Sequence, residues 1–167
     1  METQPQVVER AAQPYVAIRK SVTMQTVAAL ADRIPELFGW LGARGVEPAG
    51  APFFKYNVID MERRLEIEAG IPVGTAIAGD GEVESGVLPA GRYATVTHFG
   101  QFDKLIDVTA GLLAWAARQG LKWDKAETEE GDRWACRLEI YETDPSAEPD
   151  VNKWETVLAF KLADDSR

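Results

Sequence analysis

The sequence contains two copies of one pattern, in which a tryptophan is followed five residues later by a glycine and then by an aliphatic residue. Trp40 and Gly45 in the first copy lie 75 residues before Trp115 and Gly120 in the second, and a leucine three residues before each tryptophan keeps the same separation. A glycine and a hydrophobic residue after an amphipathic segment are typical of a helix C-terminus. Two helix ends can look alike by coincidence, so the flanking segments decide whether the chain is duplicated.

Hydrophobic residues recur at helical spacing before both copies. The segments 27–41 and 105–116 each place apolar side chains three and four residues apart, as one buried stripe of a helix requires. Pro35 interrupts the first segment, because proline lacks the amide hydrogen and clashes with the preceding turn. The sequence therefore predicts two equivalent helices, the first kinked or split at Pro35, which end at Gly45 and Gly120.

Segments that alternate as strands flank both predicted helices. Pro14 separates the first two of them. Each half of the chain then follows the order strand, helix, strand, strand, and neither half alone is large enough for a stable core. We expect one α+β domain over residues 1–167, with halves at about 6–73 and 82–163 related by a pseudo-twofold axis. We expect an antiparallel sheet with both main helices on one face and a ligand groove between the halves on the other. The predicted strands cover residues 7–9, 15–22, 53–59, 65–69, 92–99, 134–141 and 154–161, and an acidic loop is expected over residues 124–132.

Charge and composition narrow the function. The 167 residues carry a net charge of −9, which disfavours direct nucleic-acid binding and suits a cationic ligand. A single cysteine, Cys136, excludes an intramolecular disulfide, and no export signal or membrane segment is apparent. We therefore expect a cytoplasmic protein without membrane contact. The 14 residues before Tyr15 are too few for a helix-turn-helix domain.

Acidic and aromatic side chains on the predicted strands are the candidates for a site. A carboxylate among aromatic rings would have a raised pKa and could serve as general acid or base, or neutralise a cation stacked on the rings. A solvated strand face is the alternative for each acid. His98 and Cys136 form no metal cluster, and no phosphate-binding loop occurs, so we expect neither metal nor cofactor. The candidate ligand-binding residues are Tyr56, Glu66, Glu68, Trp134, Glu139, Tyr141, Trp154 and Val157, of which Glu68, Glu139 and Tyr141 are also candidate catalytic residues.

Several motifs of the second half resemble the GyrI-like small-molecule-binding domain, which is also the effector-binding part of multidrug-responsive transcription regulators. They are residues 86–94, 98–102, 113–115 with Gly120, 140–145 and 153–156. The resemblance covers residues 15–163. It implies a duplicated strand–helix–strand–strand fold whose groove binds flat, often cationic aromatic compounds beside a glutamate.

One position departs from the family pattern. Members commonly have glutamate where this chain has Val157, and Glu155 points to the opposite side of its strand. The function we expect is a stand-alone binding protein for hydrophobic, planar or cationic compounds, in drug sensing or sequestration. Two alternatives stay open: a hydrolase that opens cyclopropane-bearing alkylators, in which Glu68 or Glu139 acts with Tyr141, and a protein-interaction module such as a gyrase modulator.

Overall fold

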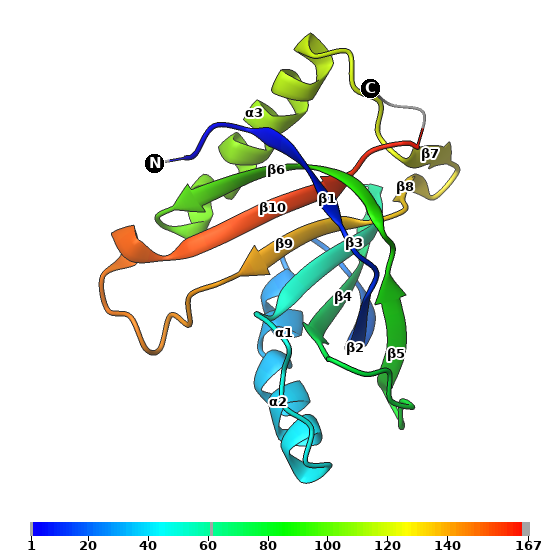
Figure 1. Cartoon of the computed structure of the whole chain (residues 1–167), viewed down its shortest axis with the longest axis vertical. Helices are drawn as coiled ribbons and strands as arrows, with labels where there is room; N and C mark the ends of the chain where they lie inside the picture. Colours follow the sequence, from blue (N-terminus) through cyan, green and yellow to red (C-terminus); the bar gives the residue numbers. More distant parts are fainter. Residues whose placement is uncertain (1, 61, 165–167) are drawn as a thin grey trace.

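The protein folds as one curled antiparallel sheet with helices packed on one side (Figure 1). The computed structural model describes residues 2–60 and 62–164. The strand order is β1-β6-β10-β9-β3-β4-β2-β5, and the hairpin of β7 and β8 joins the sheet beside β3. The strands are β1 (Gln6–Arg10), β2 (Gln13–Val22), β3 (Phe53–Asp60), β4 (Arg64–Pro72), β5 (Val83–Leu88), β6 (Gly91–Phe99), β7 (Lys125–Thr128), β8 (Gly131–Trp134), β9 (Arg137–Tyr141) and β10 (Glu155–Lys161).

The strand register confirms the pseudo-twofold relation between the halves. Tyr15 of β2 pairs with Gly86 of β5, and in the equivalent place Tyr93 of β6 pairs with Val8 of β1. Strand β1 therefore extends the sheet of the second half, and β5 extends that of the first. The halves meet where β3 pairs with β9, and the axis passes between Phe54 and Glu139, which lie opposite each other.

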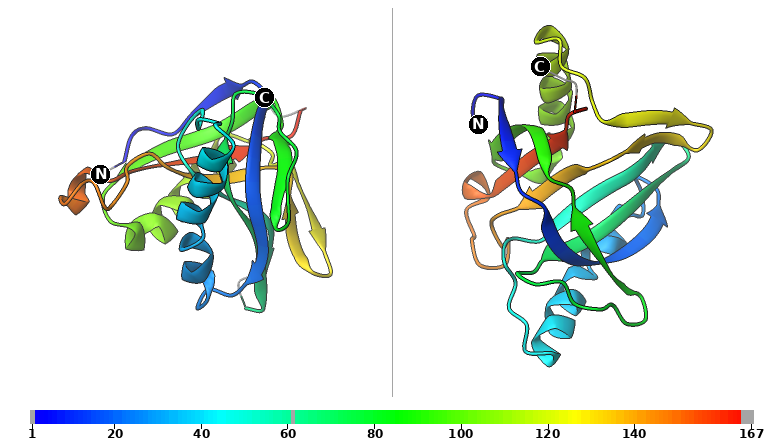
Figure 2. Two further views of the ribbon diagram at one scale, coloured as in Figure 1. Left: turned by 90° about the horizontal axis from the view of Figure 1, so that it is seen from below. Right: turned by 45° about the vertical axis from the view of Figure 1, so that its right-hand side comes forward.

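The helices are α1 (Val27–Ala31), α2 (Ile34–Ala43) and α3 (Leu105–Arg118), with short 3-10 turns at Phe102–Lys104 and Val151–Lys153. The predicted break at Pro35 is confirmed, because α1 ends at Ala31 and α2 begins at Ile34. Leu37 and Leu41 of α2 pack in one core with β2 and β4, whereas Leu112 of α3 packs in another with β6 and β10. Both helices cover the same side of the sheet, and they lie apart on it (Figure 2).

The opposite side of the sheet has a core of its own without a helix. It contains Tyr15, Phe53 and Tyr93 together with Leu138 and Ile140. The curl of the sheet and the turns at its edges bury these side chains. The α+β class, the antiparallel sheet and the placement of both main helices on one side are therefore as the sequence predicts.

Three local expectations are wrong. Residues 124–132 form part of the β7–β8 hairpin instead of a loop, because Gly131, with a φ of 125°, permits the tight turn. The strand predicted over 134–141 is two strands, β8 and β9, and β8 leaves β9 to pair with β3. Pro14 lies inside β2 and pairs with Val87 of the edge strand β5. Within the described residues, no helix has the length and apolar character needed to cross a membrane.

Candidate functional site

Glu139 lies on the helix side of the sheet, at the junction of the two halves. Because side chains alternate along a strand, β9 directs Arg137, Glu139 and Tyr141 to this side. The cross-strand neighbours of Glu139 are Phe54 and Leu158, which belong to the cores beneath α2 and α3 respectively. The carboxyl group is therefore held between two apolar cores, where the pseudo-twofold axis crosses the sheet.

Two tyrosine hydroxyls and one arginine surround this carboxyl group. The Tyr141 hydroxyl donates a hydrogen bond of 2.7 Å to Glu139 Oε1, and Tyr56 forms a second hydrogen bond with the same side chain. Burial raises the pKa of Glu139, and the two hydrogen bonds and the charge of Arg137 oppose this rise only in part. The carboxyl group is thus easier to protonate than an ordinary glutamate, and a positive charge beside it would favour its ionised form.

Aromatic rings extend from this group towards the second half. The Tyr141 ring lies 5.5 Å from the Phe54 ring and 5.7 Å from the Phe102 ring, both in edge-to-face contact. Phe102 lies 5.0 Å from Trp154, whose indole Nε1 donates a 2.9 Å hydrogen bond to the Glu148 carbonyl oxygen. Phe102 is 38% exposed, so this row of rings extends to the surface of the protein.

Sequence reasoning missed three members of this cluster, Phe54, Phe102 and Arg137. Phe54 and Arg137 lie two residues before Tyr56 and Glu139, so the period of a strand places each pair on one side of the sheet. That signal was present in the sequence. Phe102 begins a 3-10 turn after Gly100, and only the tertiary structure brings it to Tyr141.

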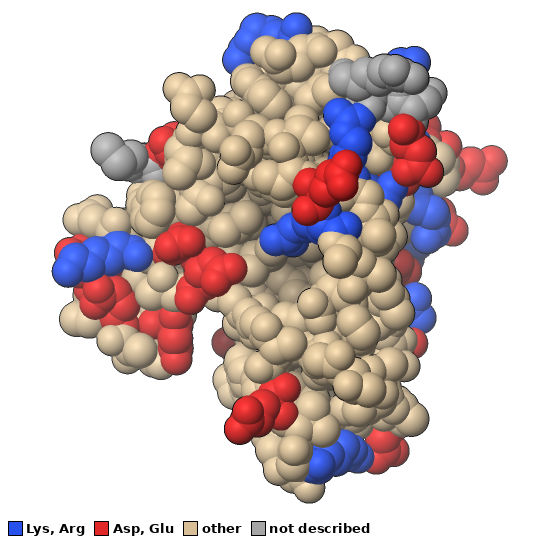
Figure 3. All heavy atoms as spheres, in the orientation of Figure 1, with Lys and Arg blue, Asp and Glu red and all other residues tan. Residues whose placement is uncertain are grey.

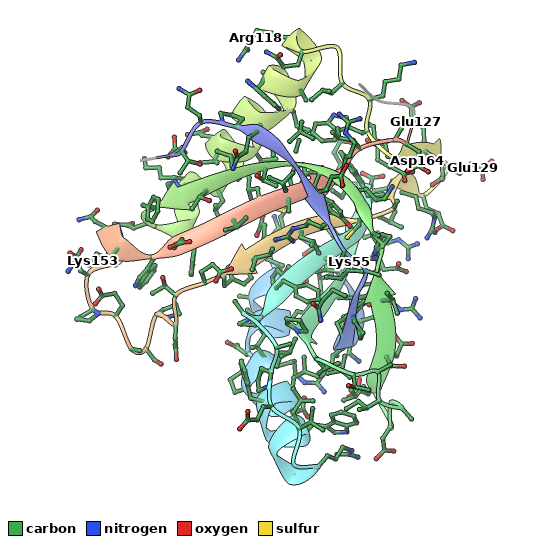
Figure 4. All side chains as sticks on the ribbon, in the orientation of Figure 1. Lys55, Arg118, Glu127, Glu129, Lys153 and Asp164 are labelled. Atoms are coloured by element: carbon green, nitrogen blue, oxygen red, sulfur yellow. The ribbon has the colours of Figure 1, made fainter. Side chains whose placement is uncertain are left out.

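A second cluster, around Glu68, lies on the side without helices. Glu68 is buried and accepts hydrogen bonds from the Tyr15 hydroxyl at 2.6 Å and from Asn57 Nδ2 at 2.7 Å, with Lys55 Nζ 3.3 Å away. Glu66 and Glu68 line a polar cavity of about 500 Å³ that also has Lys125 in its wall. Figure 4 shows Lys55 on β3, near the middle of the sheet. Tyr15, Asn57 and Lys55 thus already satisfy the Glu68 carboxylate, and a role for Glu68 in binding or catalysis stays a prediction.

Val157 faces the same side as Glu68. The register makes the two residues equivalent, since Glu68 lies opposite Lys55 of β3 while Val157 lies opposite Ile140 of β9. Val157 packs against the core on the side without helices. It therefore lies across the sheet from Tyr141, and a glutamate there would not join the aromatic cluster.

The groove expected on the side away from the helices thus does not hold all the residues assigned to it. Glu66, Glu68 and Val157 lie on that side, whereas the tyrosines and Glu139 lie on the other. The sequence shows which residues of a single strand share a side. It does not show which sides of two different strands coincide, so residues of different strands could not be assigned to one side of the sheet.

Trp134 is a core residue and not part of the aromatic cluster. Its side chain is buried in the core beneath α3, 5.5 Å from the Trp123 ring and 5.7 Å from the Phe160 ring. The break between β8 and β9 places it there, and one edge of the indole borders the polar cavity. Trp134 therefore does not join the Tyr141 cluster, and its candidate role as a ligand-binding residue stays a prediction.

Acidic side chains gather near the end of the aromatic row. Figure 3 shows them over the loop between β9 and β10, beside a notch that separates this lobe from the one formed by α2. Their negative charge attracts cations, and the rings offer faces for stacking. No group of three or more His, Cys, Asp or Glu residues in ranges 2–60 and 62–164 could hold a metal ion. The acidic residues of this loop are Glu142, Asp144, Glu148 and Asp150, and Glu155 follows as the first residue of β10.

Comparison with solved structures shows the same fold in several proteins. The C-terminal domain of EcmrR matches with a TM-score of 0.75 and 19% identity, over 96% of this chain and 97% of that domain. In the complex of EcmrR with DNA, this chain spans only 57% of the EcmrR chain. SAV2435 bound to tetraphenylphosphonium matches with a TM-score of 0.66 and 11% identity, over 96% and 94% of the two chains.

A hydrolase from Listeria innocua has the fold as well, with a TM-score of 0.60 and 12% identity over 96% of this chain and 92% of that one. At these identities the likeness concerns the fold alone. A comparison with curated proteins finds no match. The sequence profile of the GyrI-like small molecule binding domain matches residues 3–156. The chain therefore belongs to the GyrI-like family of small-molecule-binding domains.

Proposed function

We propose that this protein binds hydrophobic aromatic cations on the helix side of its sheet and acts in the cytoplasm in drug sensing or sequestration. The observation that carries the proposal is the Glu139 carboxyl group, held by Tyr56 and Tyr141 beside a row of aromatic rings. Glu139 supplies the counter-charge, and Tyr141, Phe102 and Trp154 supply the stacking surface.

The chemistry of the site favours a cation over a neutral or anionic compound. Cation–π contacts with aromatic faces contribute about 0.5–2 kcal/mol each, and an anion would be repelled by Glu139 and the acidic loop. Arg137, the basic neighbour, is already engaged, because its guanidinium lies over the Trp134 and Phe160 rings at 4.8 and 4.5 Å. The binding of tetraphenylphosphonium by SAV2435, which shares the fold, supports the same ligand class.

Calorimetric titration with tetraphenylphosphonium and with neutral triphenylphosphine oxide tests the proposal. We expect the cation to bind. Glu139→Gln should lower the affinity for the cation by about tenfold or more, because it removes one charge interaction of about 1.4 kcal/mol or larger. The neutral compound should bind equally well to both proteins. Glu66→Gln, on the other side of the sheet, is the matched control. Equal cation affinity in all three proteins would contradict the assignment of Glu139.

A second candidate function, hydrolysis, is favoured by the raised pKa of Glu139 and its contact with Tyr141. A protonated Glu139 could give its proton to one carbon of a strained cyclopropane while water attacks another. The ring C–C bond breaks, one of its carbons gains the hydrogen and the other a hydroxyl group, and the remaining proton of the water returns to the Glu139 carboxylate. Mass spectrometry of a cyclopropane-bearing alkylator incubated with the protein decides the matter. Product that disappears with Glu139→Gln would make the protein an enzyme, and binding without product would leave it a binding protein.

A further inference from the structure

A separate cavity of about 320 Å³ lies on the side of the sheet without helices, where the two halves meet. Its floor consists of Phe53 from β3 and of Leu138 and Ile140 from β9, all buried. Its walls are the turn between β1 and β2, the equivalent turn between β5 and β6, and residues 49–51. The cavity is within the usual size range for small-ligand pockets, about 300–1,000 Å³, and is mainly apolar.

This cavity and the Glu139 cluster are distinct sites. Leu138 and Ile140 flank Glu139 along β9, so their side chains point to the opposite side of the sheet. A ligand in the cavity is separated from Glu139 by the thickness of the sheet.

The pseudo-twofold axis makes one charged group at the cavity conspicuous. Arg10 pairs with Gly91 at the end of β1, and Leu88 pairs with Gln13 at the end of β5, so Arg10 and Leu88 are equivalent. Both residues line the cavity. One wall therefore carries a guanidinium where the other carries an apolar side chain.

The Arg10 guanidinium makes no hydrogen bond or ion pair with an acid in the described part of the chain, although its charge opposes the rise in the pKa of Glu142 that burial and the charge of Glu155 cause. The guanidinium lies 5.8 Å from the centre of the Tyr93 ring, and the side chain is half-buried. Glu142, the other charged residue of the lining, is exposed to solvent, which screens its repulsion of an anion. A guanidinium is suited to bind a carboxylate through two parallel hydrogen bonds.

From the apolar floor and the Arg10 guanidinium, which forms no hydrogen bond or ion pair within the described residues, we propose that this cavity binds a small monocarboxylate with an apolar body. The body fills the space over Phe53, Leu138 and Ile140, and the carboxylate pairs with Arg10 at the rim. The two sites of the protein then differ in the charge of their ligands, since the helix side accepts cations and this side accepts anions.

Titration with octanoate, followed by NMR of isotope-labelled methyl groups, tests the proposal. Saturable shifts should appear at Leu88, Leu138 and Ile140. They should persist when tetraphenylphosphonium is present in excess, and octanol should bind at least about tenfold more weakly, as expected from the loss of a charge-assisted hydrogen bond. Arg10→Met should reduce the affinity for octanoate to about the affinity for octanol. Arg19→Met is the control, because Arg19 pairs with Glu84 on the surface.

The unliganded methyl spectrum of Arg10→Met shows whether the variant folds. Equal affinities for octanoate and octanol, or an unaffected Arg10→Met, would overturn the assignment of a carboxylate. Displacement of octanoate by tetraphenylphosphonium would overturn the separation of the sites. The absence of methyl shifts at millimolar octanoate would overturn the site itself. Methyl shifts that depend on protein concentration would overturn it as well, because they would reveal a second copy of the protein on this face. Because the octanoate titration alone requires no cation binding, it is independent of the proposed function.

Discussion

Replacement of Tyr141 by phenylalanine removes one hydrogen bond from Glu139 and leaves the ring in place. The bond spans 2.7 Å and favours the ionised carboxylate, so its loss should raise the already raised pKa of Glu139 further. A hydrogen bond to a charged group contributes about 1.5–3 kcal/mol, which corresponds to about one to two pKa units. Because Tyr56 still donates to the same carboxyl group, we expect a shift near the lower figure, about one unit.

The assay is a pH titration of the Glu139 carboxyl carbon by NMR in the free protein. Tyr93→Phe is the matched control, since its hydroxyl donates a 2.7 Å hydrogen bond to the Pro89 carbonyl on the other side of the sheet. Cation binding by Tyr141→Phe should be lost at a correspondingly higher pH, because only the ionised carboxylate attracts the cation. If the midpoint of the Glu139 pH titration is unchanged or lower in Tyr141→Phe, the role assigned to the Tyr141 hydroxyl is refuted.

Three further changes test the fold and the site. Val157→Glu should lower the free energy of unfolding by about 1–3 kcal/mol in denaturant titrations, because it places a charge against the core on the side without helices, whereas Val87→Glu at a 55% exposed position should cost little. Leu112→Ala should cost about 2–5 kcal/mol through the cavity that it leaves, whereas Ile106→Ala, 65% exposed on the same helix, should stay within about 0.5 kcal/mol. The free energy of unfolding of Glu139→Gln should increase relative to that of the unmodified protein as pH rises. A carboxyl group whose pKa is raised on folding contributes stability at low pH, and that contribution is lost as pH increases through the raised pKa. Thermal unfolding across pH 4–8 would show a constant difference if the pKa of Glu139 were not raised.

The duplication could be predicted from the sequence because it depends on local patterns. The glycine after each helix, the three- and four-residue spacing before it and the alternation of the strands are all set by near neighbours along the chain. The same information predicts that Glu139 and Tyr141 share a side of their strand.

The full set of residues in the site could not be predicted, because it depends on which strands pair and in which register. Val157 and Tyr141 belong to adjacent strands, and a shift of register by one residue would have placed them on the same side. The break between β8 and β9 likewise sends Trp134 into a core, although its sequence reads as a continuation of the strand that carries Glu139. Such features follow from long-range pairing and packing.

The exchange of β1 and β5 between the halves is the arrangement of a homodimer in which each subunit lends an arm to its partner, here joined into one chain. In a homodimer any residue on the axis occurs twice, so a carboxyl group there would face its own copy at close range and the two could not both ionise readily. Fusion removes that constraint. One half can keep Phe54 at the axis while the other carries Glu139, and a single negative charge can lie at the centre of a nearly symmetric surface.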